Sequence, residues 1–166
     1  MRKLLLMLAL LPMMAIAGNV KSPNGNIELK FSINQEGRPV YEMTYKDKTV
    51  IKPSFLGLEL AKDKHASKGL IETDLMDNFR LVNEETSEFD ETWQPVWGET
   101  RDIRNHYNEL AVTLVQIIET PSYTADGNSP GLALIPHERK MIIRFRVYDD
   151  GIGFRYEFPQ QPELNY

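Results

Sequence analysis

Apolar and polar residues alternate along much of this chain with the period of two that is typical of half-buried strands. The segment 140–148 shows the pattern most clearly. Its apolar residues Met141, Ile143 and Phe145 alternate with mainly charged ones. No segment has the 3.6-residue period of a convincing amphipathic helix. The alternation predicts seven or eight strands, over residues 27–33, 41–45, 49–51, 55–60, 79–88, 109–117, 140–148 and 152–158.

Turn-forming and irregular segments separate these strands. Asp149-Asp150-Gly151 is typical of a hairpin turn between the last two. Pro53 is expected to end the third strand, because proline cannot donate to a hydrogen-bond ladder. Residues 61–78 and 119–138 are predicted to be connections. The segment 89–107 holds both tryptophans and few aliphatic side chains, so we expect a long functional loop or irregular edge structure there.

Short strands joined by turns predict an all-β fold, an antiparallel β-sandwich. The length of 166 residues suits one domain. The chain stops at Tyr166, shortly after the last predicted strand. We therefore expect the sandwich to be incomplete at its C-terminus.

Residues 1–17 have the pattern of a secretory signal peptide. Arg2-Lys3 forms a positive start, Leu4–Met14 is an apolar run, and Ala15-Ile16-Ala17 supplies the small residues that signal peptidase reads. The run is too short for a permanent membrane span. A buried N-terminal helix is the alternative, but polar residues would interrupt a core helix. We expect cleavage after this tripeptide, export, no further membrane association, and a mature domain over 18–166.

Composition and charge exclude several classes of function. The apolar share of 42% and the charged share of 26% are those of a soluble globular protein. The absence of cysteine excludes a disulfide framework, a cysteine nucleophile and cysteine-bound zinc. The net charge of −5 argues against binding to nucleic acid, which would normally require a basic patch.

Catalytic and metal-binding motifs are missing from the sequence. The chain has no GxSxG, GxxxxGK[ST] or HExxH pattern. Its histidines, His65, His106 and His137, are isolated from one another. Adjacent carboxylates such as Glu84-Glu85 point to opposite faces of a strand, so they rarely converge on one substrate atom. No catalytic residue and no metal ligand is assigned.

The segment Thr92–Leu110 combines two indoles with arginines, carboxylates, asparagines and a histidine. This inventory suits sugar recognition, because aromatic faces stack on the CH groups of a pyranose while polar side chains bind its hydroxyls. The alternative is that the tryptophans plug an edge of the sandwich while the charged groups face water. Composition alone leaves both interpretations open.

Several motifs together resemble the N-terminal domain of glycoside hydrolase family 97. The resemblance extends from about Val20 to Tyr166, although 119–138 does not match and is longer than expected. The motifs that carry it are Val96–Glu99, Ile103–Leu110 and Phe145–Tyr156, supported by Ser22–Ile27 and Gly37–Tyr41.

The resemblance implies an exported α-glucosidase or α-galactosidase of a Gram-negative, polysaccharide-degrading bacterium, periplasmic or secreted. Such an enzyme has an N-terminal β-super-sandwich, a central (β/α)8 barrel and a small C-terminal β-domain. Its catalytic carboxylates lie on the barrel, and it holds calcium in its active site. No catalytic or metal residue is transferred to this chain, which is expected to be inactive alone because the barrel is absent.

The resemblance also implies two partners, the barrel of the same polypeptide and an α-linked oligosaccharide. In this interpretation the domain docks on the barrel and helps to shape its sugar site. A free-standing carbohydrate-binding module and a purely structural β-domain are the alternatives. The candidate residues facing substrate or barrel are Trp93, Trp97, Glu99, Asn105 and His106.

Overall fold

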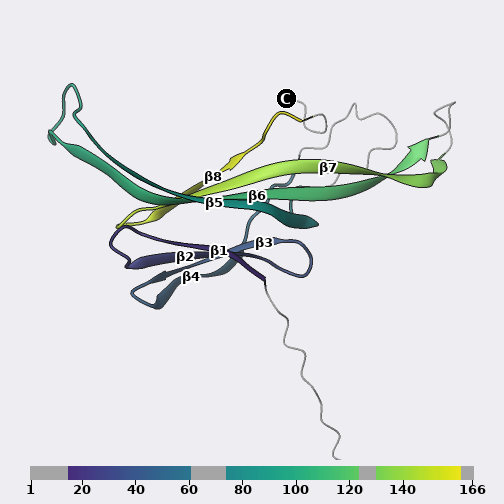
Figure 1. The fold of residues 1–166 in the computed structure, drawn as a ribbon, viewed down its shortest axis with the longest axis horizontal. Coiled ribbons are helices and arrows are strands. Elements are labelled where there is room, and N and C mark those ends of the chain that lie inside the picture. Colours follow the sequence, from purple (N-terminus) through teal and green to yellow (C-terminus); the bar gives the residue numbers. More distant parts are fainter. Residues whose placement is uncertain (1–14, 61–73, 124–129, 162–166) are drawn as a thin grey trace, which may run out of the picture.

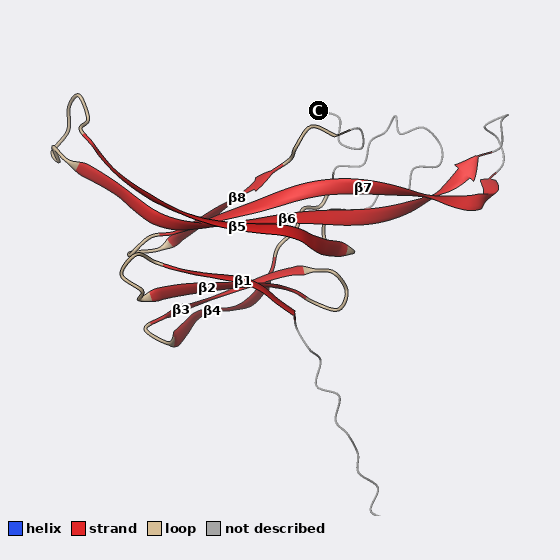
Figure 2. Cartoon of the chain, in the orientation of Figure 1, coloured by secondary structure: helices blue, strands red, loops and turns tan. Residues whose placement is uncertain are grey.

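The chain folds into two four-stranded antiparallel sheets stacked in two layers (Figure 1). The computed structural model describes residues 15–60, 74–123 and 130–161, and within them Figure 2 shows strands and loops but no helix. The predicted all-β antiparallel sandwich is therefore confirmed. Strands that are neighbours in sequence are neighbours in each sheet. The first sheet contains β1 (Ala15–Lys21), β2 (Ile27–Ile33), β3 (Pro39–Tyr45) and β4 (Lys48–Phe55); the second contains β5 (Phe79–Trp93), β6 (Ile103–Tyr123), β7 (Pro130–Val147) and β8 (Ile152–Glu157).

The core lies between the sheets and is built from alternate residues of the central strands. Phe31 of β2 and Phe145 of β7 are fully buried, and their ring centroids are 5.9 Å apart across the two layers. Each such aromatic pair adds about 0.5–1.5 kcal/mol beyond the burial of its area. The other core residues with almost no exposure are Leu29, Leu75, Leu110, Val112, Leu114, Met141, Ile143 and Val147.

A direct backbone contact links the two sheets. The turn between β2 and β3 accepts two hydrogen bonds from the start of β5: Asn78 N–H donates to Glu36 O at 3.0 Å, and Phe79 N–H to Gly37 O at 2.9 Å. Gly37 has a φ of 73°. A Cβ built on it would lie 2.6 Å from the Phe79 nitrogen, so only glycine fits this approach.

The first sheet differs from the prediction in three places. The structure contains β1, which the sequence pattern did not predict. Strand β4 continues through Pro53, which was expected to end it. The proline is tolerated because β4 is an edge strand and its pairing with β3 is irregular between Tyr41 and Met43. The prediction of a strand over 55–60 is also wrong. Strand β4 ends at Phe55, and residues 56–60 contribute to β-structure only through the isolated bridge between Leu58 and Leu75.

The second sheet has longer strands than predicted. Strands β5 and β6 pair from Phe79↔Gln116 to Trp93↔Ile103, so much of the segment 89–107 is a regular hairpin rather than a loop. Strands β6 and β7 pair as far as Tyr123↔Pro130, so the prediction of a connection over 119–138 is wrong for its strand residues. Residues 124–129 and most of the predicted connection 61–78 lie outside the described residues.

The close approach at Gly37 predicts a difference between two glycines of similar conformation. Gly25 has a φ of 75° but no atom within 4 Å of its ideal Cβ. We expect Gly37→Ala to lower the free energy of unfolding by at least about 1 kcal/mol more than Gly25→Ala, because only the first also overpacks backbone. Urea denaturation of the two variants measures this; equal losses would show that the contact between the sheets can adjust.

Candidate interaction surface on the second sheet

The paired ends of β5 and β6 form an arm that projects beyond the first sheet (Figure 1). We define the arm as residues 87–107. Side-chain contacts link its two strands: Arg104 donates to both carboxylate oxygens of Asp90 at 2.8 and 2.7 Å, and His106 Nε2 lies 3.4 Å from Glu88 Oε1. The hydrogen bonds from Arg104 lower the pKa of Asp90. These contacts hold together a ribbon that has little apolar core of its own.

The arm separates the five predicted site residues into three groups. Trp93 pairs with Ile103, and Asn105 pairs with Glu91, so Trp93 and Asn105 share one face. His106 lies on the opposite face. Trp97 and Glu99 are exposed in the loop at the tip of the arm. The register therefore does not bring all five into a single site.

Apolar side chains at the tip of the arm are unusually exposed. Val96 is 101% exposed, Trp97 88% and Trp93 46%. The tryptophans therefore do not plug an edge of this sandwich, which was the alternative left open by composition. Exposed apolar groups gathered in this way mark a surface for interaction.

A second group of functional interest lies on the outer face of the second sheet, away from the first sheet. Glu109 of β6 accepts from Arg144 Nη1 at 2.5 Å and from Arg146 Nε at 2.9 Å. Glu157 of β8 accepts from Arg144 Nε at 2.8 Å and from Arg155 Nε at 2.7 Å. These five residues alternate in charge, in the order Arg146, Glu109, Arg144, Glu157 and Arg155. We call them the charge ladder.

The arginines of the charge ladder keep its carboxylates ionised. Hydrogen bonding from Arg144 is the main cause that lowers the pKa of Glu157 to about 2. Burial alone would raise the pKa of Glu109, but hydrogen bonds from Arg146 and Arg144 outweigh burial and leave it below its ordinary value. The same hydrogen bonds raise the pKa of Arg144. Glu109 and Glu157 are therefore ionised at neutral pH.

A row of aromatic rings flanks the charge ladder. Tyr107 stacks on Phe89, and its ring also meets Tyr148, with centroid separations of 5.2 Å in both cases. The Arg146 guanidinium carbon lies 4.5 Å from the centroid of the Tyr107 ring. Arginine and tyrosine are enriched where proteins bind partners. The outer face thus has the composition of an interaction surface.

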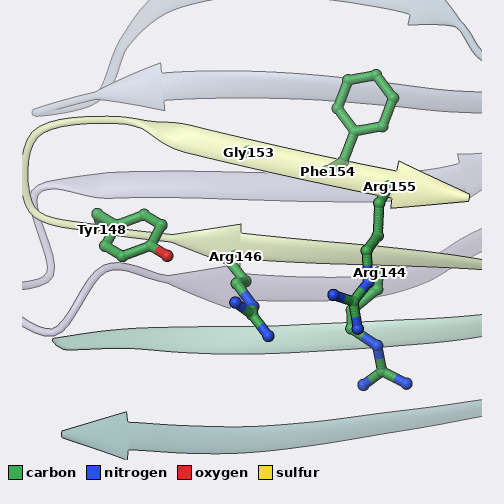
Figure 3. A pocket seen from close by; sticks show the side chains of 6 residues that line it. All are labelled: Arg144, Arg146, Tyr148, Gly153, Phe154 and Arg155. Carbon is green, nitrogen blue, oxygen red and sulfur yellow. The ribbon is translucent and has the colours of Figure 1, made fainter. Parts of the chain in front are cut away.

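A shallow depression opens beside the charge ladder over β7 and β8 (Figure 3). Its volume is about 190 Å³. The alternation over 140–148 indicates that its charged residues face away from the core, but it did not predict this site. The sequence signal for the site is charge repeated at alternate positions, Arg144 with Arg146 and Arg155 with Glu157. The lining residues are Arg144, Arg146, Tyr148, Gly153, Phe154 and Arg155.

The described residues offer no fit for the calcium that the family resemblance implies. Among residues 15–60, 74–123 and 130–161, no three histidine, aspartate or glutamate side chains gather where they could hold a metal ion. The most buried carboxylate, Glu109, already binds two arginines. None of these described residues is therefore assigned to calcium. The part of the chain that the structure describes also contains no helix with the length and hydrophobicity of a transmembrane span.

The low pKa of Glu157 predicts that its contribution to stability depends on pH. Because this pKa is about 2 in the fold against an ordinary 4.5, the contribution is complete above pH 4.5 and is lost as the pH falls towards 2. At pH 7 we expect Glu157→Gln to lower the free energy of unfolding by about 1–2 kcal/mol, allowing for solvent screening.

Denaturant titrations at several pH values measure this loss. The loss should shrink between pH 4.5 and 2, as the wild-type carboxyl becomes protonated. The control Glu42→Gln, at a carboxylate 4.0 Å from Lys30 Nζ, should cost less. A cost at Glu157 that did not vary with pH would contradict a stabilising role for its charge.

Comparison with known proteins agrees with this architecture. The family described as Glycosyl-hydrolase 97 N-terminal matches residues 20–166. A Glycoside Hydrolase Family 97 enzyme from Pseudoalteromonas sp. strain K8, solved in complex with acarbose, is 29% identical with a TM-score of 0.66, and the match covers 89% of this chain and 18% of the enzyme. A variant of the same enzyme in complex with panose gives the same values.

A β-arabinopyranosidase shares the fold at 23% identity, with a TM-score of 0.62. The match covers 89% of this chain and 19% of that protein. The chain thus spans less than a fifth of the length of the solved enzymes to which it is similar. Since the family match includes nearly every residue of the described sandwich, this chain belongs to the glycosyl-hydrolase 97 N-terminal family.

Proposed function

We propose that this chain is the non-catalytic N-terminal domain of an exported glycoside hydrolase that acts on α-glucosides or α-galactosides. In that role it docks on a (β/α)8 barrel of the same polypeptide and helps to shape the sugar site. The observation that carries the proposal is the family match over residues 20–166, together with the small share, 18%, that the match covers of the Pseudoalteromonas enzyme. The sugar ligands of that enzyme suggest the substrate class.

The state of the carboxylates supports a non-catalytic role. Hydrolysis of a glycosidic bond requires two carboxyl groups across the bond, and one must be protonated to act as the acid. Glu109 and Glu157 are the two carboxylates of the charge ladder on the outer face. Both have a lowered pKa and both are paired with arginines. They are therefore poor proton donors at neutral pH.

The arm is the feature best suited to reach a neighbouring domain. A two-stranded ribbon is marginally stable by itself, and a large aromatic side chain gains free energy when it is buried. Trp97 and Val96 would bury their exposed surface if the tip entered a crevice of the barrel or covered a sugar. Trp93 and Asn105 would then lie behind them on one face, and Glu99 beside them. His106, on the other face, would face away from that contact.

Export is part of the proposal. Cleavage after Ala17 would leave the regular part of β1, because the pairing of β1 with β2 is irregular between Ile16 and Gly18 and regular from Gly18↔Phe31 onward. The expected location is the periplasm or the medium of a Gram-negative bacterium. Calcium is expected in the complete enzyme, held outside the described residues of this chain.

The first test is the size and activity of the native polypeptide. An antibody raised against this domain should detect a band several times larger than 19.2 kDa in the source cells. The larger polypeptide should hydrolyse α-glucosides or α-galactosides, and the purified 166-residue chain should not. A stable native band at or slightly below 19.2 kDa, with sugar binding by the chain alone, would favour a free-standing carbohydrate-binding module instead.

The second test is Trp97→Ala in the larger polypeptide. If the tip of the arm contacts sugar or barrel, we expect a loss of about 2 kcal/mol or more in that contact, the scale of a buried hot-spot tryptophan. It should raise the KM for the sugar or increase proteolytic separation of the domains. The melting temperature of the isolated chain should not change, because Trp97 is 88% exposed.

Phe55→Ala, on the first sheet at 59% exposure, is the matched control and should change none of these. Unchanged KM and unchanged proteolysis in Trp97→Ala would remove the tip from the proposed contact.

A further inference from the structure

The charge ladder begins and ends with a positive group. Its three arginines and two glutamates alternate, so Arg146 and Arg155 are the two ends. The ladder therefore carries one uncompensated positive charge in a chain whose net charge is −5. Glu157 and Glu109 each bridge two arginines. Arg146 and Arg155 each pair with only one carboxylate in the part of the chain that the structure describes.

Both ends of the ladder flank the same glycine. Gly153 of β8 pairs directly with Arg146 of β7, and Arg155 is the next residue of β8 on the same face. Figure 3 shows these residues around the depression, with Phe154 pointing to the opposite side of the strand. An ideal Cβ on Gly153 would meet no atom within 4 Å, so the surface above this glycine is open, and Arg146 and Arg155 line the same depression.

We propose that the depression over Gly153 receives the carboxylate of an aspartate or glutamate side chain from the part of the enzyme that lies outside this chain. This inference rests on the proposed function and identifies where the rest of the enzyme docks. A carboxylate seated between Arg146 and Arg155 joins the two ends of the ladder, so that three positive and three negative groups alternate around a ring. Charge-assisted hydrogen bonds of this kind are among the strongest in proteins.

The shape of the surface favours a protein side chain over an acidic sugar as the source of the carboxylate. Sugar-sized ligands bind in concave pockets that cover most of their surface. Here the depression is shallow and is bordered by Tyr148, whose ring meets that of Tyr107. A charged centre beside an aromatic strip suits a broad protein interface. The 18% coverage of the Pseudoalteromonas enzyme leaves ample polypeptide to supply it.

Selective labelling of arginine with phenylglyoxal, read by mass spectrometry, tests the proposal. In the isolated chain Arg155 is accessible, with 59% of its side chain exposed. In the larger native polypeptide its labelling should slow by at least about tenfold, the scale expected for a buried interface arginine. Arg38, at the turn before β3 in the first sheet, should be labelled equally in both and serves as the internal control.

A pair of glycine variants locates the contact. Gly153→Leu fills the depression without removing a charge, whereas Gly151→Leu places the same side chain in the adjacent turn. Neither glycine has a positive φ, and neither Cβ meets an atom within 4 Å, so both variants should fold. In the larger polypeptide Gly153→Leu should abolish the protection of Arg155, and Gly151→Leu should retain it.

The outcomes separate this inference from the proposed function. Equal labelling of Arg155 in a larger native polypeptide, or protection that survives Gly153→Leu, would overturn the docking site and leave the proposed function intact. A native polypeptide at or slightly below 19.2 kDa, with no larger form, would overturn both. Protection of Arg155 in the isolated chain by sodium glucuronate, without protection in the larger polypeptide, would assign the depression to an acidic sugar and overturn the protein contact.

Discussion

The two sheets of this domain have unequal lengths, and most of its features depend on that mismatch. The strands of the first sheet have seven or eight residues, while β5, β6 and β7 have 15, 21 and 18. The first sheet can therefore cover only part of the second. Where the layers overlap, Phe31 and Phe145 meet in a buried apolar core, and the backbone of Gly37 lies against Phe79. Where the layers do not overlap, the long strands continue as ribbons that are held together by backbone hydrogen bonds between strands and by ion pairs.

The outer face of the second sheet uses charge where the core uses apolar packing. On its outer face, Arg144 lies opposite Arg155, an arrangement that would be destabilising by itself. Glu157 offsets that repulsion because it accepts hydrogen bonds from both. Glu109 does the same between Arg144 and Arg146. The network is therefore strong enough to order the face and still has an unmatched positive charge at its ends.

Two surfaces thus remain available to a partner, the apolar tip of the arm and the charged depression over Gly153. They are built from different interactions. Trp97 at the tip offers an exposed apolar surface that does not fix the orientation of a partner. In our proposal, the guanidinium groups of Arg146 and Arg155 instead bind a carboxylate in a defined position. Apolar contact supplies affinity, and charged groups supply orientation and specificity. In the role proposed above, a domain that holds one position against a barrel needs both.

The sequence by itself determined the fold class and the family of this protein. The alternation at 27–33 and 140–148 shows which side chains face the core, because the side-chain period of a strand is local. The motifs at Val96–Glu99 and Phe145–Tyr156 indicated the family that the comparison confirmed. Only the tertiary structure decided the length of the arm, because a ribbon exposed on both faces needs no apolar alternation. The structure alone also showed that Asn105 and His106 lie on opposite faces of the arm, that Pro53 is tolerated on an edge strand and that the five groups of the charge ladder assemble. These features depend on pairing between residues far apart in the chain, and no local pattern encodes that pairing.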